Sequence, residues 1–371
     1  MKYLVWVLCL FLFLSHNVFA ADVYEELKET VRAEVLEVTE EHIEDIVGTD
    51  TDQVVQTVQI QVTEGERRGS RAELLNDITP LTVGDSIYVN RLETIDGVEY
   101  YQFKDVDRRW ALVSLVGLFA VVLILFSGTH GIRALVSLAL SIGLMFFVLV
   151  PLLLKGYPPV PVSVCVSVGM LAIVLFSTHG VHPRSVIAFL GTFGAVVVTG
   201  GIALLWSELA HLTGLSSDAA IYLNFSTKGS LDFSGLLLGS IIIGILGILD
   251  DVAITQASVV EELRRANNDL NMRELYERAL RVGRDHIGSL VNTLALAYVG
   301  AALPLVLLMV AAQSSLTLAL NQEIVAVELV RIFVGSIGLV LAVPFTTFLA
   351  AWWYDVHEVP MREEGAHGHT H

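Results

Sequence analysis

Long apolar stretches separated by short polar loops dominate the chain from Trp110 onward. Each stretch is close to the roughly 20 residues that a helix needs to cross a hydrocarbon core of about 30 Å. The seven stretches cover residues 109–127, 132–154, 160–177, 184–206, 233–255, 286–312 and 325–353. The pattern therefore predicts an α-helical polytopic membrane protein with seven transmembrane helices.

Residues 22–108 follow a different pattern, in which apolar and polar positions alternate with the period of two that is typical of strands. Asp96-Gly97 is a hairpin signal before the last of these runs. The candidate strands cover residues 31–38, 54–62, 83–92 and 98–103. We therefore expect a small, mostly β, barrel-like domain ahead of the helices.

Residues 1–20 have the pattern of a secretory signal peptide. Lys2 precedes an apolar run from Tyr3 to Leu14. A candidate cleavage site follows after Ala20, where the neighbouring residues are small. This run is shorter than a membrane span. Whether the segment is cleaved or stays as an anchor, residues 22–108 are predicted to lie outside the cytoplasm.

Because residues 22–108 lie outside and seven spans follow them, the carboxyl-terminal tail, residues 355–371, is predicted to lie in the cytoplasm. The amphipathic segment 258–285, between the fifth and sixth spans, is then cytoplasmic, and its arginines follow the positive-inside rule. The opposing loops, 155–159 and 207–232, contain only two lysines. Arg108 and Arg109, on the outer side of the first span, run against the rule.

Composition narrows the function classes. The chain is 54% hydrophobic and 16% charged, which disfavours a purely cytosolic enzyme. Its formal charge is −17, and residues 22–108 hold 22 acidic against 8 basic side chains, so a nucleic-acid partner is disfavoured. These carboxylates are interpreted as a solvated acidic face. With Cys9 and Cys165 as the only cysteines, neither a disulfide framework nor a Cys-rich zinc site is expected.

An internal duplication is visible in the first helices. The run Leu-Phe-Ser-Gly-Thr-His-Gly at residues 125–131 recurs as Leu-Phe-Ser-Thr-His-Gly at residues 175–180. Residues 109–206 are therefore interpreted as a duplicated pair of hairpins. Repeated units are common in transport proteins, although they also occur in proteins that transport nothing. His130 and His179 in the repeated turns are interpreted as caps or loop residues rather than metal ligands.

The fifth span, at the start of segment 233–354, carries the most informative polar residues. Asp250 and Asp251 lie in its inner third, with no cation within four positions on either side. An ionised carboxylate there costs about 2.5–3.5 kcal/mol on insertion scales. A raised pKa that keeps a proton bound, or a bound cation, relieves that cost. The alternative is an extended helix cap without a mechanistic role.

Other residues of the last three spans are candidate supporting groups. Asn292 and Thr293 in the sixth span match the depth of Asp250, so Asn292 is expected either to hydrogen-bond a carboxyl or to form an ordinary interhelical bond. Glu328 and Arg331 are spaced to pair with each other. Thr255 and Gln256 follow the aspartates by about one turn. The small residues that favour close helix packing are Gly235, Gly239, Gly244 and Gly247.

The stretches 247–263 and 283–298 resemble the bacterial YibE/F family. The first contains Gly-Ile-Leu-Asp-Asp, and the second contains Gly-Arg-Asp-His followed by Asn292. The resemblance extends over the β domain, the Thr-His-Gly hairpins and the last spans. The resemblance implies a multi-pass bacterial plasma-membrane protein. It does not indicate any particular activity.

A second resemblance is to the resistance-nodulation-division superfamily, of the SecD/SecF type. The order of Asp250, Asp251, Asn292-Thr293 and Gly335-Ser336 is similar. The duplicated hairpins and the amino-terminal position of the exported domain depart from that pattern. Proton coupling is therefore a hypothesis that this resemblance motivates.

Two functions follow as expectations. The first is a transport-related protein that couples to a proton or cation through Asp250 and Asp251. The second is a non-transporting assembly or scaffold protein whose exported domain binds a partner. No enzyme activity, cofactor or metal is expected, because Gly247-Ile-Leu-Asp250 is not the motif of intramembrane aspartyl proteases, and the spans contain no Ser/His or His-Glu-x-x-His arrangement. The expected partners are the lipid bilayer and either a second copy or another membrane protein.

Overall fold

The computed structural model describes residues 29–46, 51–93, 99–311 and 315–357. The signal-like segment, the Asp96-Gly97 turn and most of the carboxyl-terminal tail lie outside these residues. The chain divides into two compact units, and the division falls between Phe126 and Ser127.

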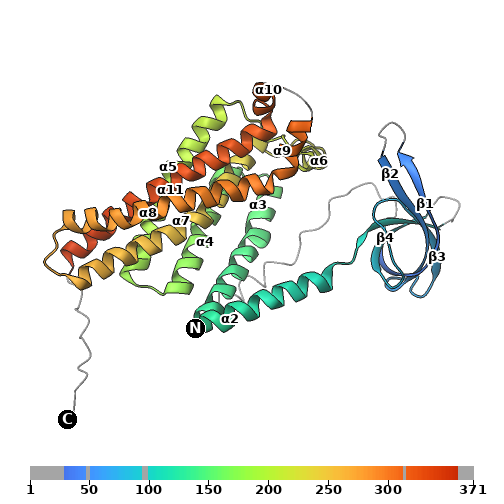
Figure 1. Cartoon of the computed structure of the whole chain (residues 1–371), viewed down its shortest axis with the longest axis horizontal. Helices are drawn as coiled ribbons and strands as arrows, with labels where there is room; N and C mark the ends of the chain where they lie inside the picture. Colours follow the sequence, from blue (N-terminus) through green and yellow to red (C-terminus); the bar gives the residue numbers. More distant parts are fainter. Residues whose placement is uncertain (1–28, 47–50, 94–98, 312–314, 358–371) are drawn as a thin grey trace, which may run out of the picture. The chain divides into compact units, whose positions relative to one another are not determined.

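The first unit contains a curved, five-stranded antiparallel half-barrel (Figure 1). Its strand order is β3-β2-β1-β4-β5. The strands are β1 Glu29–Ile46, β2 Thr51–Val62, β3 Arg71–Asn76, β4 Ser86–Glu93 and β5 Glu99–Val106. Alternate residues such as Val31, Ala33 and Val35 of β1 form the buried face. The sequence analysis missed β3, because only its Leu74 and Asn76 are buried.

Helices make up the rest of the described chain. They are α2 Arg109–Leu144, η1 Met145–Leu149, α3 Val150–Leu154, α4 Pro159–His179, α5 Pro183–Leu209, α6 Asp218–Ser226, α7 Phe233–Ala266, α8 Met272–Ala301, α9 Leu303–Ala311, α10 Leu316–Leu320 and α11 Glu323–Val356. Within the described residues, five helical segments are long and apolar enough to cross a membrane, and α8 with α9 makes a sixth if the bent pair is one span. The expected count of seven is therefore not reproduced.

The difference in count arises at two places. Residues 109–154, expected as two spans, form one helical run of 46 residues. A straight helix of that length would be about 70 Å long, twice the thickness of a hydrocarbon core. The run is interrupted at Gly128, whose backbone angles are φ 56 and ψ −130. The other place is the bend of 63° between α8 and α9, where Pro304 disfavours a straight continuation.

The amphipathic segment 258–285 does not form helices of its own. Its first part is the end of α7, and its second part is the beginning of α8, which starts with a capping box between Asn271 and Glu274. Two i,i+4 ion pairs form in this segment, Glu261 with Arg265 at 2.5 Å and Arg273 with Glu277 at 2.8 Å, whereas Glu274 takes part in the capping box.

Helix α7 is the centre of the bundle and packs against α4, α5, α8 and α11 (Figure 1). Two polar contacts mark the bundle's ends. At the Glu323 end, the Glu323 carboxylate accepts hydrogen bonds from the backbone N–H groups of Thr213 and Gly214, at 2.7 and 2.9 Å. At the Arg264 end, the buried Arg264 donates to the carbonyl of Tyr354 at 2.7 Å. Helices α7 and α11 therefore run in the same direction.

Candidate functional site

Helix α7 has two faces of small residues that pack differently. A Cβ placed on Gly239 would lie 2.3 Å from the Ser163 hydroxyl, and one on Gly235 would lie 3.3 Å from Pro159, so this face is in close contact with α4. Gly244 and Gly247 belong to another face. Gly244 lies near Tyr298 of α8, whereas a Cβ on Gly247 would have no described atom within 4 Å. The predicted close packing is therefore present at Gly235, Gly239 and Gly244, whereas Gly247 has open surroundings.

A pocket with a volume of about 140 Å³ lies on the second face, between α7, α8 and one residue of α11. Its polar groups are Asp251, Thr255 and Gln256 from α7 and His286 from α8. Its apolar wall consists of Val252, Val259, Val282, Leu290 and Val343. The pocket brings together three of the predicted residues and adds His286.

Close contact between α7 and α8 forms one wall of this pocket. The Gln256 side chain is 4% exposed and donates from Nε2 to the carbonyl of Ala279 at 2.8 Å. A Cβ on Gly283 would lie 2.5 Å from Val343 and 2.9 Å from the Gln256 amide oxygen. Gln256 therefore connects the two helices, and Gly283 permits their approach.

The two aspartates differ in surroundings. Asp250 is half-buried, and its Oδ1 accepts a hydrogen bond from the Asp251 backbone N–H at 2.9 Å. Asp251 is exposed and lines the pocket. Within the described part of the chain, neither carboxylate lies within 4.0 Å of a cationic side chain.

Asn292 and Thr293 are not brought to the aspartates. Asn292 is exposed, and its side chain forms none of the hydrogen bonds found among the described residues. The Thr293 hydroxyl donates to the carbonyl of Ser289 at 2.9 Å, within α8. The expected hydrogen bond between Asn292 and a carboxyl does not form, because Asn292 projects from a face of α8 that does not line the pocket.

The two Thr-His-Gly motifs do converge near the pocket. His179, the last residue of α4, lies within electrostatic range of His130, Arg184 and Asp251. Among the described residues, no three His, Cys, Asp or Glu side chains are placed to hold a metal ion. The convergence therefore places basic groups near Asp251 without making a metal site.

The predicted pair in α11 is formed. Arg331 Nη1 donates to Glu328 Oε1 at 2.7 Å, and its guanidinium carbon lies 5.8 Å from the centre of the Tyr298 ring. Tyr298 was not singled out as a site residue, although a tyrosine that follows a polar stretch within a span was a usable signal. Arg264 was likewise considered only for the positive-inside rule, yet it is buried and its hydrogen bond to Tyr354 connects α7 to α11.

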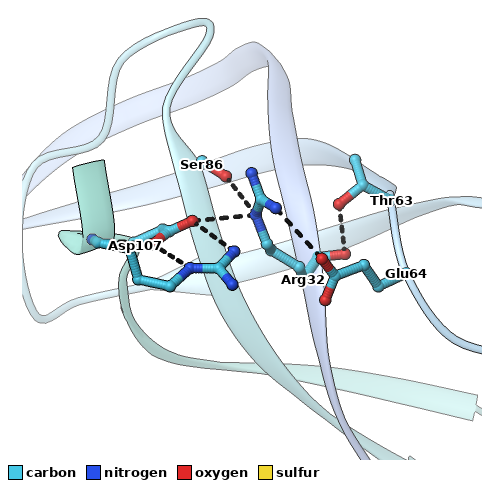
Figure 2. Close-up of polar contacts among 6 residues, drawn as sticks. Arg32, Thr63, Glu64, Ser86 and Asp107 are labelled. Atoms are coloured by element: carbon cyan, nitrogen blue, oxygen red, sulfur yellow. Dashed lines mark hydrogen bonds and ion pairs between the residues drawn. The ribbon is translucent and has the colours of Figure 1, made fainter. Parts of the chain in front are cut away.

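The half-barrel contains a contrasting carboxylate, Asp107 (Figure 2). Its side chain is 2% exposed and lies 3.0 Å from the Nε atoms of both Arg32 and Arg109. Hydrogen bonding from the Arg109 side chain, followed by its backbone bond and the charges of both arginines, holds the pKa of Asp107 below its ordinary value. The guanidinium of Arg109 also lies over the Tyr88 ring, at 5.4 Å. This cluster attaches the start of α2 to the sheet.

Comparison with known proteins gives one match. Neither the curated proteins nor the solved structures include a match to this chain. A family model described as YibE/F-like protein matches residues 115–356, which is well over half of the chain. That region contains the aspartates, the pocket and both Thr-His-Gly motifs. The chain therefore belongs to the YibE/F-like family of membrane proteins.

Proposed function

We propose that the protein is a transport-related, non-enzymatic membrane protein in which Asp250 and Asp251 exchange a proton or a small cation with the pocket. The observation that carries this proposal is the acid pair in a membrane-length helix, without a cation within ion-pair distance among the described residues. A carboxylate in such a place is costly unless it is neutralised. His179 lies within electrostatic range of Asp251 but forms no ion pair with it, so a mobile proton or small cation is the neutralising partner that we propose.

The geometry supports exchange rather than permanent burial. Asp251 lines the pocket, so an ion in the pocket reaches it without a change in the packing of α7. Asp250 is the less accessible neighbour. Because two adjacent carboxylates repel each other when both are ionised, neutralising one of them favours charge on the other. The pair is therefore suited to binding one positive charge at a time.

We further propose that the protein spans the bacterial plasma membrane, with residues 22–108 outside and the Arg264 end of the bundle in the cytoplasm. The arginines at this end favour that orientation. It requires residues 109–154 to cross twice, with the turn at Gly128. The nearness of His130 to His179 supports this, because α4 begins near Gly235 and so ends with His179 at the Arg264 end.

Ion flux through purified protein in liposomes tests the proposal. The Asp250→Asn, Asp251→Asn double variant is expected to insert normally and to lose pH-gradient-dependent flux. Asp285→Asn is the matched control, since Asp285 is an exposed aspartate on α8 that does not line the pocket. Equal flux in the double variant and the wild type would contradict the proposal.

A scaffold role for the half-barrel is the second candidate. The hairpin formed by β1 and β2 carries exposed carboxylates on residues 40, 41, 44, 45 and 52. Such an arm favours a basic partner through charge complementarity. Salt-sensitive binding of a partner by the wild type, lost when these carboxylates are neutralised, would support this role, and it would leave ion flux unchanged.

A further inference from the structure

The pocket beside Asp251 has a polar end and an apolar end. Helices α7 and α8 follow each other through the short connection 267–271 and pack together, so residues equally far from this connection lie side by side. Asp251 and His286 are both far from it and share one end of the pocket. Val259 and Val282 are nearer to the connection and lie toward the other end.

The acceptor groups that α7 contributes to the pocket lack matching donors. Among the described residues, the Asp251 carboxylate accepts no hydrogen bond. The Gln256 amide uses its nitrogen to bind the carbonyl of Ala279, and its oxygen, beside Gly283 on the pocket wall, accepts no hydrogen bond from the described residues. A ligand that donates hydrogen bonds and carries a positive charge is complementary to this arrangement.

The volume of the pocket limits the ligand to a few atoms. At about 140 Å³, it is close to the size of an engineered apolar cavity of about 150 Å³ that binds benzene. The pocket therefore has room for about five or six non-hydrogen atoms.

An inorganic cation fits this lining poorly. Magnesium and calcium ions take about six or more oxygen ligands, whereas the side-chain oxygens of the pocket belong only to Asp251, Thr255 and Gln256. The apolar wall would remove water from a hydrated ion without replacing its ligands. An alkyl group, in contrast, is stabilised by burial against the same wall.

We propose that the cation exchanged at Asp251 is a small alkylammonium ion, a protonated primary amine with about four carbons. This inference rests on the proposed function of the aspartate pair and names the class of its cation. The ammonium group donates hydrogen bonds to the Asp251 carboxylate and the Gln256 amide oxygen. The alkyl chain lies against Val259 and Val282. Binding and release change no covalent bond.

Calorimetric titration of the purified full-length protein in detergent tests this assignment with a series of alkylammonium chlorides from methyl to octyl. Binding is measured instead of flux, because neutral amines cross lipid unaided. The Kd is expected to fall about fourfold with each added methylene and to stop falling at butyl or pentyl, when the pocket is full. 1-Butanol, an uncharged molecule of similar shape, is expected not to bind. A Kd that keeps falling through octyl would indicate partition into detergent and contradict the assignment.

Two variants locate the bound ion. Asp251→Asn is expected to weaken butylammonium binding by at least about tenfold, because it removes a charge-assisted hydrogen bond. Asp285→Asn, which changes an exposed aspartate of α8 outside the pocket, is the matched control and is expected to retain the wild-type Kd. Val259→Ala enlarges the apolar end and is expected to shift the preferred chain to a longer one. A loss of stability alone would not produce this shift.

The outcomes separate this inference from the proposed function. If the aspartate double variant loses ion flux but Asp251→Asn binds butylammonium as tightly as the wild type does, the class of cation is wrong and the proposed function stands. If butylammonium binding requires Asp251 while the double variant keeps its flux, the pocket binds the amine and the proposed coupling is wrong. Butanol that binds as tightly as butylammonium contradicts a site for a cation.

Discussion

Carboxylates in the half-barrel and in the helical bundle have opposite surroundings. In the half-barrel, Asp107 is covered and has two arginines within 3.0 Å, so its charge is fixed. In the bundle, Asp250 and Asp251 lie in a membrane-length helix, and no cation of the described chain is within ion-pair distance. Two arginines of the bundle are engaged elsewhere, since Arg264 binds backbone carbonyls and Asp355, and Arg331 binds Glu328.

The contrast shows what distinguishes a structural carboxylate from an exchangeable one. Removing a partner from a buried pair leaves an uncompensated charge, so such pairs are maintained by the fold. A carboxylate without a fixed partner is neutralised by a proton or ion that is free to leave. The comparison therefore predicts that supplying a fixed partner to Asp251 abolishes function, and that removing one from Asp107 harms stability.

The largest effect is expected when a counter-ion is placed beside Asp251. Thr255→Arg puts a guanidinium one helical turn from Asp251, on the same wall of the pocket. Ion flux in liposomes should fall by about tenfold or more, because an opposite charge nearby stabilises the ionised carboxylate by at least one pKa unit. Thr255→Gln is the neutral control of similar shape. Undiminished flux in Thr255→Arg would contradict the exchange model.

A change in the pocket wall is expected to have a moderate effect. Gly283→Leu forces a side chain into the space held by Val343 and the Gln256 amide. Overpacking of this kind typically costs about 1–3 kcal/mol of folding free energy. A thermal unfolding assay in detergent should report the loss, and Gly288→Leu, at a position with open surroundings on the same helix, should not show it.

A smaller effect is expected at Asp107 and should depend on pH. Because its folded pKa lies below the ordinary value, Asp107 stabilises the half-barrel fully at pH values above the ordinary carboxyl pKa. This contribution is lost as the pH falls through the folded value. Asp107→Asn should therefore lower the unfolding temperature at neutral pH and converge with the wild type in strong acid. A difference that grows on acidification would contradict this sign.

The smallest effect is expected at Asp105, which completes the comparison within the half-barrel. Asp105 pairs with Arg108 at 2.5 Å, but both side chains are 58% exposed. Solvent screens such a pair, so its net contribution is small. Asp105→Asn should leave the unfolding temperature close to that of the wild type. A loss as large as that of Asp107→Asn would show that burial does not separate these two carboxylates.

Much of the architecture was predictable, because apolar length and strand alternation are local properties. Residues 160–177 and 184–206 correspond closely to α4 and α5, and alternation indicated four of the five strands. The break at Gly128 was interpreted as a loop, and the bend before Pro304 was not foreseen. Pro304 and Gly128 were local signals of a possible bend or break, but neither residue type fixes the angle between the helical segments on its two sides.

The site was predictable only in part. The absence of a nearby cation along the sequence indicated Asp250 and Asp251, and i,i+3 spacing indicated the pair of Glu328 with Arg331. Matching depth was not enough to place Asn292, since depth does not fix the angle at which a residue projects from its helix. Tyr298, Arg184 and the contact of Gln256 with Ala279 depend on tertiary packing between helices.

The most direct test of the central claim is infrared difference spectroscopy of the carboxyl groups in protein reconstituted into liposomes. On changing pH or cation concentration, the wild type should show a carboxyl C=O band that appears and disappears reversibly. The band should be absent from the Asp250→Asn, Asp251→Asn variant and retained in Asp285→Asn. An aspartate signal that stays constant across pH and cation concentration would contradict the claim that this pair exchanges its charge.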